Sequence, residues 1–210
     1  MKRLPHLFEN NRAWARDTLA ASPDYFERLS AQQAPRYLWI GCADSRVPAN
    51  MVTGTDPGEM FVHRNVANVV THTDVNCLSV LQYAVEVLKV RDVIVCGHYG
   101  CGGVLAAMGG KRYGLIDNWL RHIKDVYHEH RDRLDDPSLT DAQRADLFCE
   151  LNVSAQVANV CHTTVVQDAW SRGHDLAVHG WIYGLGDGLL KDLGLTVTSS
   201  EQLPEIYRMG

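Results

Sequence analysis

The chain has 210 residues, which predicts one compact domain with a peripheral arm rather than two domains. With 46% hydrophobic and 21% charged residues it can bury a sizeable core, which excludes an intrinsically disordered protein. The net charge of -5 and the absence of a basic run argue against nucleic acid as an obligate partner.

The N-terminal sequence lacks the apolar core of a signal peptide, and no run approaches the roughly 18 apolar residues of a membrane span. We therefore expect a cytoplasmic protein with no membrane partner. In that compartment six cysteines are expected to serve metal binding, redox chemistry or burial rather than disulfides. Four of them sit among apolar neighbours and are predicted to be buried: Cys77, Cys96, Cys149 and Cys161.

The first thirty residues are predicted to be helical, with a break at Ser22, Pro23 and Asp24. Ser22 suits an N-cap and Pro23 suits the first helical position after it. The apolar stripe of these helices comprises Leu7, Phe8, Trp14, Leu19, Tyr25, Phe26 and Leu29. Residues 1–33 thus form a helical arm, which packs either on its own domain or on another subunit.

Strands and helices alternate through the rest of the chain. Strands are predicted over 36–41, 60–63, 92–97, 176–183 and 195–198. Helices are predicted over 74–90, from about 100, over 115–134 and from 140 to near 173, where Thr140 and Gln143 form a capping box. A strand, a helix and a strand with a short return force a parallel pair. We therefore predict an α/β fold with a mostly parallel central β-sheet flanked by helices, as a single domain over 1–210.

Ligand-type side chains follow two of these strands. Cys42, Asp44 and Arg46 stand at alternate positions after the first strand, so in an extended segment they share one face. His98 and Cys101 follow the strand over 92–97. Because ligands gather beyond the carboxyl ends of parallel strands, the two groups can converge in one crevice.

Two thiolates and one imidazole suit zinc better than magnesium or calcium, so we expect one Zn²⁺ per chain bound by Cys42, His98 and Cys101. Asp44 either closes the site as a fourth ligand or pairs with Arg46 and leaves the fourth position free. The guanidinium favours the open form, because it stabilises the carboxylate that is not a ligand.

The motifs Cys42-Ala-Asp44-Ser-Arg46 and His98-Tyr-Gly-Cys101 resemble the signature of the β-class carbonic anhydrases. The likeness runs from about Leu7 to about Leu193. It implies reversible hydration of CO₂ to bicarbonate and a proton by attack of zinc-bound hydroxide, with Asp44 orienting the nucleophile and Arg46 holding Asp44. It also implies dimers that assemble into tetramers.

In members of this family an apolar CO₂ pocket lies at a dimer interface. The positions that match it are Gln33, Phe61, Val66, Tyr83 and the backbone of Gly102. From the residues alone, the three apolar side chains among these would be assigned to the core.

The sequence further resembles the bacterial, bicarbonate-regulated (type II) branch of the family. Trp39, Arg64 and Tyr183 match its inhibitory anion site. The resemblance implies that bicarbonate bound there accompanies ligation of zinc by Asp44 and release of Arg46. Taken singly, Trp39 is typical of a strand residue facing the core and Arg64 of a surface charge.

Three other functions compete with this interpretation. A thiol phosphatase needs a longer anion-wrapping loop than the three residues between Cys42 and Arg46. Thiol redox chemistry is disfavoured because the sequence has no Cys-x-x-Cys pair. A non-catalytic protein with a closed structural zinc site uses the same ligands and is the alternative that the sequence leaves open.

Overall fold

The computed structural model describes residues 3–31 and 33–209. The chain divides into two compact units, Met1–Ala34 and Pro35–Gly210. The N-terminal unit holds helices α1 (Pro5–Ala21) and α2 (Tyr25–Ala31), and the rings of Trp14 and Phe26 meet edge to face across them with centroids 5.5 Å apart. Helices were predicted here, but the expectation for Pro23 was wrong. It lies in the turn between the two helices, because α2 begins only at Tyr25.

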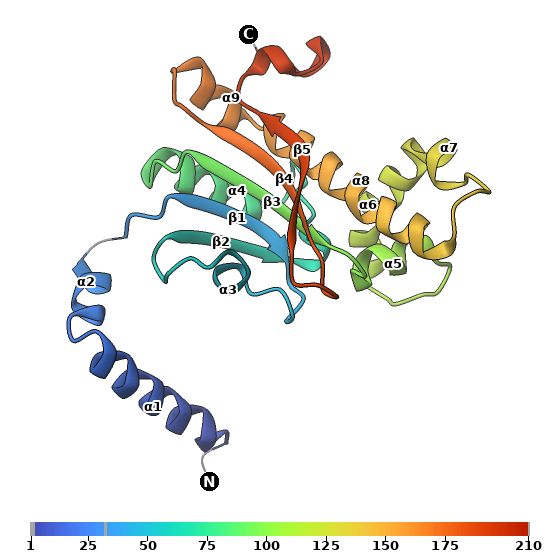
Figure 1. The fold of residues 1–210 in the computed structure, drawn as a ribbon. Helices are drawn as coiled ribbons and strands as arrows, with labels where there is room; N and C mark the ends of the chain where they lie inside the picture. Colours follow the sequence, from blue (N-terminus) through green and yellow to red (C-terminus); the bar gives the residue numbers. More distant parts are fainter. Residues whose placement is uncertain (1–2, 32, 210) are drawn as a thin grey trace. The chain divides into compact units, whose positions relative to one another are not determined.

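The second unit is built on a five-stranded sheet (Figure 1). Its strands are β1 (Tyr37–Cys42), β2 (Met60–Asn65), β3 (Asp92–His98), β4 (Ala177–Tyr183) and β5 (Leu190–Val197). They lie in the order β2-β1-β3-β4-β5. The first four are parallel, and β5 is antiparallel to β4. The predicted α/β fold with a mostly parallel central sheet is therefore confirmed.

Helical crossovers make the parallel pairing possible. The connection from β2 to β3 holds the 3-10 turn η1 (Val66–Asn68), helix α4 (Val75–Gln82) and the π-helical turn η2 (Tyr83–Val87). The connection from β3 to β4 holds α5 (Gly102–Met108), α6 (Ile116–Glu129), α7 (Arg131–Leu134), α8 (Asp141–Cys161) and α9 (Thr164–Ser171). The short helix α3 (Ala49–Thr53) follows β1, and the 3-10 turns Ser200–Gln202 and Glu205–Tyr207 follow β5.

Several element boundaries differ from the sequence prediction, and the helix predicted over 115–134 is interrupted at His130, between α6 and α7. The helix predicted over 74–90 changes to π-helical geometry at Tyr83. The helical region predicted from 140 to 173 is two helices, because the Thr163 side chain caps a new helix by accepting from the Val166 N–H. The capping box of Thr140 and Gln143 at the start of α8 is confirmed. The last strand begins at Leu190 rather than at residue 195. Because it is an edge strand with one exposed face, it carries polar residues that obscure the hydrophobic pattern of a strand.

Both faces of the sheet are buried, which explains why β1 and β3 lack the alternation of a half-exposed strand. On one face Leu38, Ile40, Val93 and Val95 pack against side chains of α4, α8 and α9. Figure 1 shows these three helices on the same side of the sheet. On the other face Trp39, Ile94 and Cys96 form a smaller cluster with residues of α3 and β2.

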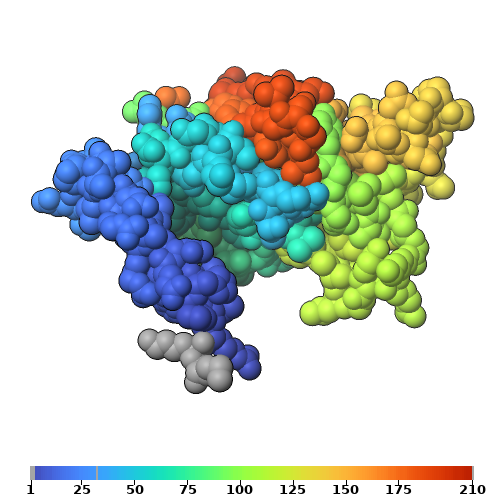
Figure 2. Space-filling view, turned by 60° about the horizontal axis from the view of Figure 1, so that its bottom comes forward, coloured from blue at the N-terminus to red at the C-terminus, as the bar shows by residue number. Residues whose placement is uncertain are grey.

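A third cluster lies at the carboxyl ends of β1 and β3, where α5, α6 and the start of α8 pack together. It includes Cys42, Ala67 and Cys101. In Figure 2 the segment around residues 45–70, in cyan and teal, lies beside the green segment that begins near residue 100. This packing brings the ends of two strands far apart in sequence to one place.

The four cysteines assigned to the core are buried, as predicted: Cys77, Cys96, Cys149 and Cys161. Burial raises the pKa of the Cys77 and Cys161 thiols to about 12. None of the helices in the described part of the chain combines the length and the apolar character that crossing a membrane requires.

Candidate metal centre

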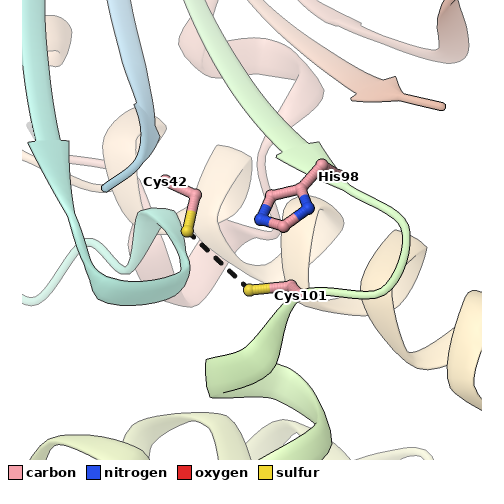
Figure 3. Close-up of side chains that lie close together, drawn as sticks. All are labelled: Cys42, His98 and Cys101. Carbon is pink, nitrogen blue, oxygen red and sulfur yellow. Dashed lines mark hydrogen bonds between the residues drawn. The ribbon is translucent and has the colours of Figure 1, made fainter. Parts of the chain in front are cut away.

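Three side chains with metal-binding atoms meet at the carboxyl ends of β1 and β3 (Figure 3). Cys42 is the last residue of β1, His98 is the last residue of β3, and Cys101 directly precedes α5. Their ligand atoms all lie within 4.8 Å of one another, and all three side chains are buried. The neighbouring positions of β1 and β3 in the sheet thus produce the convergence that was expected from the sequence.

The spacing and orientation of these atoms fit a tetrahedral zinc ion. The two sulfur atoms are 3.8 Å apart, and two Zn–S bonds of about 2.3 Å at a tetrahedral angle place sulfur atoms about 3.8 Å apart. His98 Nδ1 lies 3.1 Å from the Tyr99 carbonyl oxygen, to which it donates when it carries the proton. His98 Nε2 is buried and has no hydrogen-bond partner in the described structure, so its lone pair is free to bind a cation.

The two thiols have very different acidities. A hydrogen bond from Cys101 lowers the pKa of the Cys42 thiol against the opposing effect of burial, with further lowering by His98 and by the N–H groups of Asp44 and Ala67. The pKa of the Cys101 thiol is raised, mainly because it is hydrogen-bonded to Cys42. Cys42 is therefore the thiol that ionises first, and a bound dication would favour ionisation of both.

Asp44 is held by Arg46 rather than directed at the three donors. Arg46 Nε donates to Asp44 Oδ1 at 2.9 Å and Nη2 donates to Oδ2 at 2.7 Å, while the Arg46 N–H donates to Oδ1 at 2.9 Å. Mainly because of the side-chain hydrogen bonds from Arg46, the pKa of the Asp44 carboxyl lies well below its usual range. Asp44 Oδ2 remains 3.7 Å from His98 Nε2, so the carboxylate borders the centre.

The strand argument for this motif was wrong in one respect. β1 ends at Cys42, and Asp44 and Arg46 lie in the turn that follows it, so they do not share a strand face with Cys42. Arg64 on β2 holds this turn, because its Nε donates to the Cys42 carbonyl oxygen at 2.8 Å and its Nη2 donates to the Asp44 carbonyl oxygen. Arg64 is half-buried, which differs from the surface charge that it suggests when taken singly.

The other two residues matched to the inhibitory anion site lie on the sheet face that carries α3. Trp39 is fully buried there, and Tyr183 on β4 packs against the same cluster. Trp39 Nε1 lies over Gly41, where an added Cβ would be only 2.1 Å from it, and it has no hydrogen-bond partner in the described structure. Gly41 pairs with Arg64 in the sheet, so the indole N–H faces the strand position next to Arg64.

The residues matched to the CO₂ pocket fall into three groups. Val66 packs in the cluster that contains Cys42 and Cys101, and Gly102 begins α5 immediately after Cys101. Phe61 and Tyr83 form a ring pair with centroids 5.8 Å apart, and Tyr83 is 44% exposed, so it is not the core residue that its type suggests. Gln33 belongs to the N-terminal unit, where it is exposed.

A polar network that the sequence did not suggest supports the loop between His98 and Cys101. The Tyr99 hydroxyl donates to Glu150 Oε1 on α8 at 2.5 Å, and Lys191 Nζ on β5 donates to the same oxygen at 2.9 Å. The pKa of Glu150 is lowered, because these two hydrogen bonds outweigh the effect of burial. Only the position of Tyr99 beside His98 hinted at a role, since its partners lie 51 and 92 residues away.

The comparisons with known proteins agree with this geometry. The family model described as carbonic anhydrase matches residues 37–190. A solved structure, a Coccomyxa β-carbonic anhydrase in complex with acetazolamide, superimposes with a TM-score of 0.90 at 41% identity over 96% of this chain and 90% of that one. The chain belongs to the β-carbonic anhydrase family.

Other relatives of this β-carbonic anhydrase come from several organisms. A carbonic anhydrase of Emericella nidulans is 49% identical over 90% of this chain and 82% of its own length. A carbonic anhydrase of Pseudomonas aeruginosa is 34% identical over 93% and 91% of the two chains. Because the similarity includes a fungal and a bacterial protein, it establishes the family and does not distinguish the bacterial, bicarbonate-regulated branch.

Proposed function

We propose that this β-carbonic anhydrase catalyses the reversible hydration of CO₂ to bicarbonate and a proton. The observation that carries the proposal is the group of three donor atoms on Cys42, His98 and Cys101 beside a carboxylate that is already held by a guanidinium. A zinc ion bound there supplies Lewis acidity that activates a water molecule as a nucleophile, best at mildly alkaline pH because two thiolates balance its charge.

Asp44 orients the nucleophilic water by accepting its proton in a hydrogen bond. The carboxylate is a pure acceptor when ionised, and the pKa shift caused by Arg46 favours that state. Three hydrogen bonds from Arg46 fix both oxygens, so the water meets an acceptor of fixed direction. Arg64 also stabilises the turn that carries Asp44, because it donates to the backbone carbonyl oxygens of Cys42 and Asp44.

Apolar side chains near the donors are suited to hold CO₂. Val66 packs beside Cys42 and Cys101, and the Gly102 N–H at the start of α5 is in the matching position to donate to an oxygen of the substrate. Phe61 and Tyr83 provide a second apolar surface. The exposure of Tyr83 leaves this surface open to completion by another subunit.

We propose a second copy of the chain as the partner for the apolar surface of Phe61 and Tyr83. A crystal structure of tetrameric β-carbonic anhydrases from Sordaria macrospora superimposes with a TM-score of 0.86 at 38% identity. Within the N-terminal unit, helix α1 buries none of its residues, and Phe8 and Trp14 on it are exposed. Association into dimers or tetramers would bury such apolar side chains.

The main alternative is a closed, structural zinc site. It would require Asp44 to leave Arg46 and become the fourth ligand, and the three hydrogen bonds between them favour the open arrangement. The test is stopped-flow measurement of CO₂ hydration at about pH 8.5 on protein with one zinc per chain. We expect a large acceleration over buffer; no acceleration at full zinc content would favour the structural alternative.

Regulation by bicarbonate is a further part of the proposal. Trp39, Arg64 and Tyr183 match the inhibitory site, and the buried Trp39 N–H has no partner in the described structure, so it is available to an anion. A hydrogen bond to a charged ligand contributes about 1.5–3 kcal/mol, so Tyr183→Phe should weaken bicarbonate inhibition about tenfold or more. Inhibition of hydration at a series of bicarbonate concentrations measures this.

Tyr127→Phe is the matched control for that variant, since its hydroxyl donates to Asp135 at 2.6 Å on the surface. We expect it to keep the inhibition constant of the unmodified enzyme. If Tyr183→Phe and Trp39→Phe both retain full inhibition, this chain lacks the regulatory site.

A further inference from the structure

Helix α8 carries three amide side chains on the face that it turns toward the segment after β2. Asn152, Gln156 and Asn159 are spaced four and three residues apart, which places them in one row along the helix. Asn152 and Gln156 are each 1% exposed. A buried amide is costly unless it is hydrogen-bonded, so the partners of this row indicate its purpose.

The partners are backbone groups of residues 67–70. Asn152 Nδ2 donates to the Ala67 carbonyl oxygen at 3.0 Å, and the Val70 N–H donates to Gln156 Oε1 at 2.8 Å. Gln156 Nε2 donates to Asn152 Oδ1 at 3.2 Å, which fixes the Asn152 amide with its N–H toward Ala67. The amide row therefore positions a loop rather than the helix itself.

That loop holds the turn η1, whose backbone is unfavourable. Ala67 has φ 64° and Asn68 has φ 48°, and both lie in the left-handed region that residues with a Cβ seldom adopt. Such a conformation persists only when its surroundings hold it. Asn152 holds the Ala67 carbonyl from one side, and Trp119 Nε1 on α6 donates to the Val66 carbonyl oxygen at 2.8 Å from another.

The turn directs a backbone donor at a metal-ligand sulfur. The Ala67 N–H donates to Cys42 Sγ at 3.4 Å, alongside the Asp44 N–H at the same distance. The turn also packs against the start of α5, since a Cβ on Gly103 would lie 2.9 Å from Val66 Cγ1 and 3.0 Å from the Ala67 Cβ. The position of η1 thus fixes the hydrogen bond that the Cys42 sulfur receives.

We propose that Asn152, oriented by Gln156 and assisted by Trp119, is a positioning residue that holds the Ala67 N–H on the sulfur of Cys42. An N–H donor withdraws charge from a thiolate, so this contact sets how strongly Cys42 donates to a bound cation. The inference rests on the proposed metal centre and adds to it Asn152, which is not hydrogen-bonded to any of the three metal-binding residues in the described structure.

The test uses the whole protein loaded with Co²⁺ in place of zinc, because thiolate-to-cobalt charge transfer reports directly on the electron density of the sulfur. In Asn152→Leu the band is expected to move to longer wavelength. Co²⁺ affinity should fall about 10- to 100-fold, the usual effect of losing an outer partner of a ligand, because the loss of positioning outweighs the greater charge on the sulfur. Absorption spectroscopy and competition with a chelator measure the two effects.

Gln167→Leu is the matched control. Gln167 is also a buried helix amide, 4% exposed, and it donates to the Tyr207 carbonyl oxygen at 2.9 Å in the C-terminal segment. This variant loses the same kind of bond, so a general loss of stability affects it too. It should keep the spectrum and the Co²⁺ affinity of the unmodified protein.

An Asn152→Leu protein with an unchanged band would overturn the inference, since the amide would then only stabilise the fold. If that variant does not fold, Trp119→Phe decides instead, because it removes the other donor to η1: a shifted band supports the inference and an unchanged band overturns it. A wild-type protein without any thiolate-to-cobalt band would overturn the metal centre as well, which is a distinct result.

Discussion

Cys42→Ser is expected to remove the metal and to reduce CO₂ hydration to the buffer rate. The hydroxyl of serine does not ionise near neutral pH, whereas the lowered pKa of the Cys42 thiol leaves a thiolate ready to bind. Losing only an outer partner of a ligand costs about 10- to 100-fold in affinity, so losing the ligand itself should cost more than about 100-fold. Zinc content after dialysis and stopped-flow rates measure the two effects.

Cys161→Ser is the control for this variant. Cys161 is also buried, at the end of α8. It belongs to the core cluster that Leu38 and Val93 form with side chains of α4, α8 and α9, and not to the cluster that contains Cys42. Its replacement should lower stability without changing zinc content or turnover. Full zinc occupancy in Cys42→Ser would show that the cation binds elsewhere.

Asp44→Asn is expected to keep zinc and to lose most of its turnover. The asparagine amide retains one acceptor oxygen. Its NH₂ group, however, would face Arg46 Nη2, which in the unmodified protein donates to Asp44 Oδ2 at 2.7 Å. The side chain therefore reorients, and the water loses an acceptor of fixed direction. Positioned groups of this kind contribute about 10²- to 10⁴-fold, so we expect kcat to fall at least about 100-fold.

Asp135→Asn provides the comparison, since Asp135 accepts from Arg131 Nε at 2.9 Å on an exposed helix end. It should leave both zinc content and kcat unchanged. Complete loss of zinc in Asp44→Asn would contradict the proposed role, because Asp44 would then be an obligatory ligand and the site a closed one.

The ligand group could be predicted from the sequence because strand topology determines it. Once β1 and β3 are parallel neighbours, the residues that end them must meet, and Cys42 and His98 are those residues. The sequence favoured the pairing of Asp44 with Arg46, but the turn after β1 that carries both residues, and the way Arg64 from β2 holds that turn, could not be predicted.

The groups that support the ligands were missed for a different reason. Asn152 is 85 residues from the carbonyl that it binds, and Trp119 is 53 residues from its partner. Trp119 falls in the helix predicted over 115–134 and Asn152 in the helical region predicted from 140 to near 173, and neither prediction gave these side chains a role of their own. Contacts of this range depend on how the helices pack on the sheet, and no local pattern encodes them.

The edge of the sheet was predicted less well than its centre. β1 and β3 are apolar runs bounded by turn residues, a clear signal for buried parallel strands. β5 contains Lys191, Asp192 and Gly194, and its register with β4 shifts at Gly180 and Trp181. Pairing with β4, rather than its own residues, makes the segment from Leu190 a strand.

Because Cys42 and His98 end two different strands, the metal site exists only in the folded chain. The supply of metal therefore also affects how long the chain stays folded. Cys42 and Cys101 are 59 residues apart, and they meet only when the crossover through α4 has closed. A cation that binds this folded arrangement and not the open chain shifts the folding equilibrium by mass action. Scarcity of zinc would therefore reduce the amount of enzyme that survives proteolysis as well as its activity.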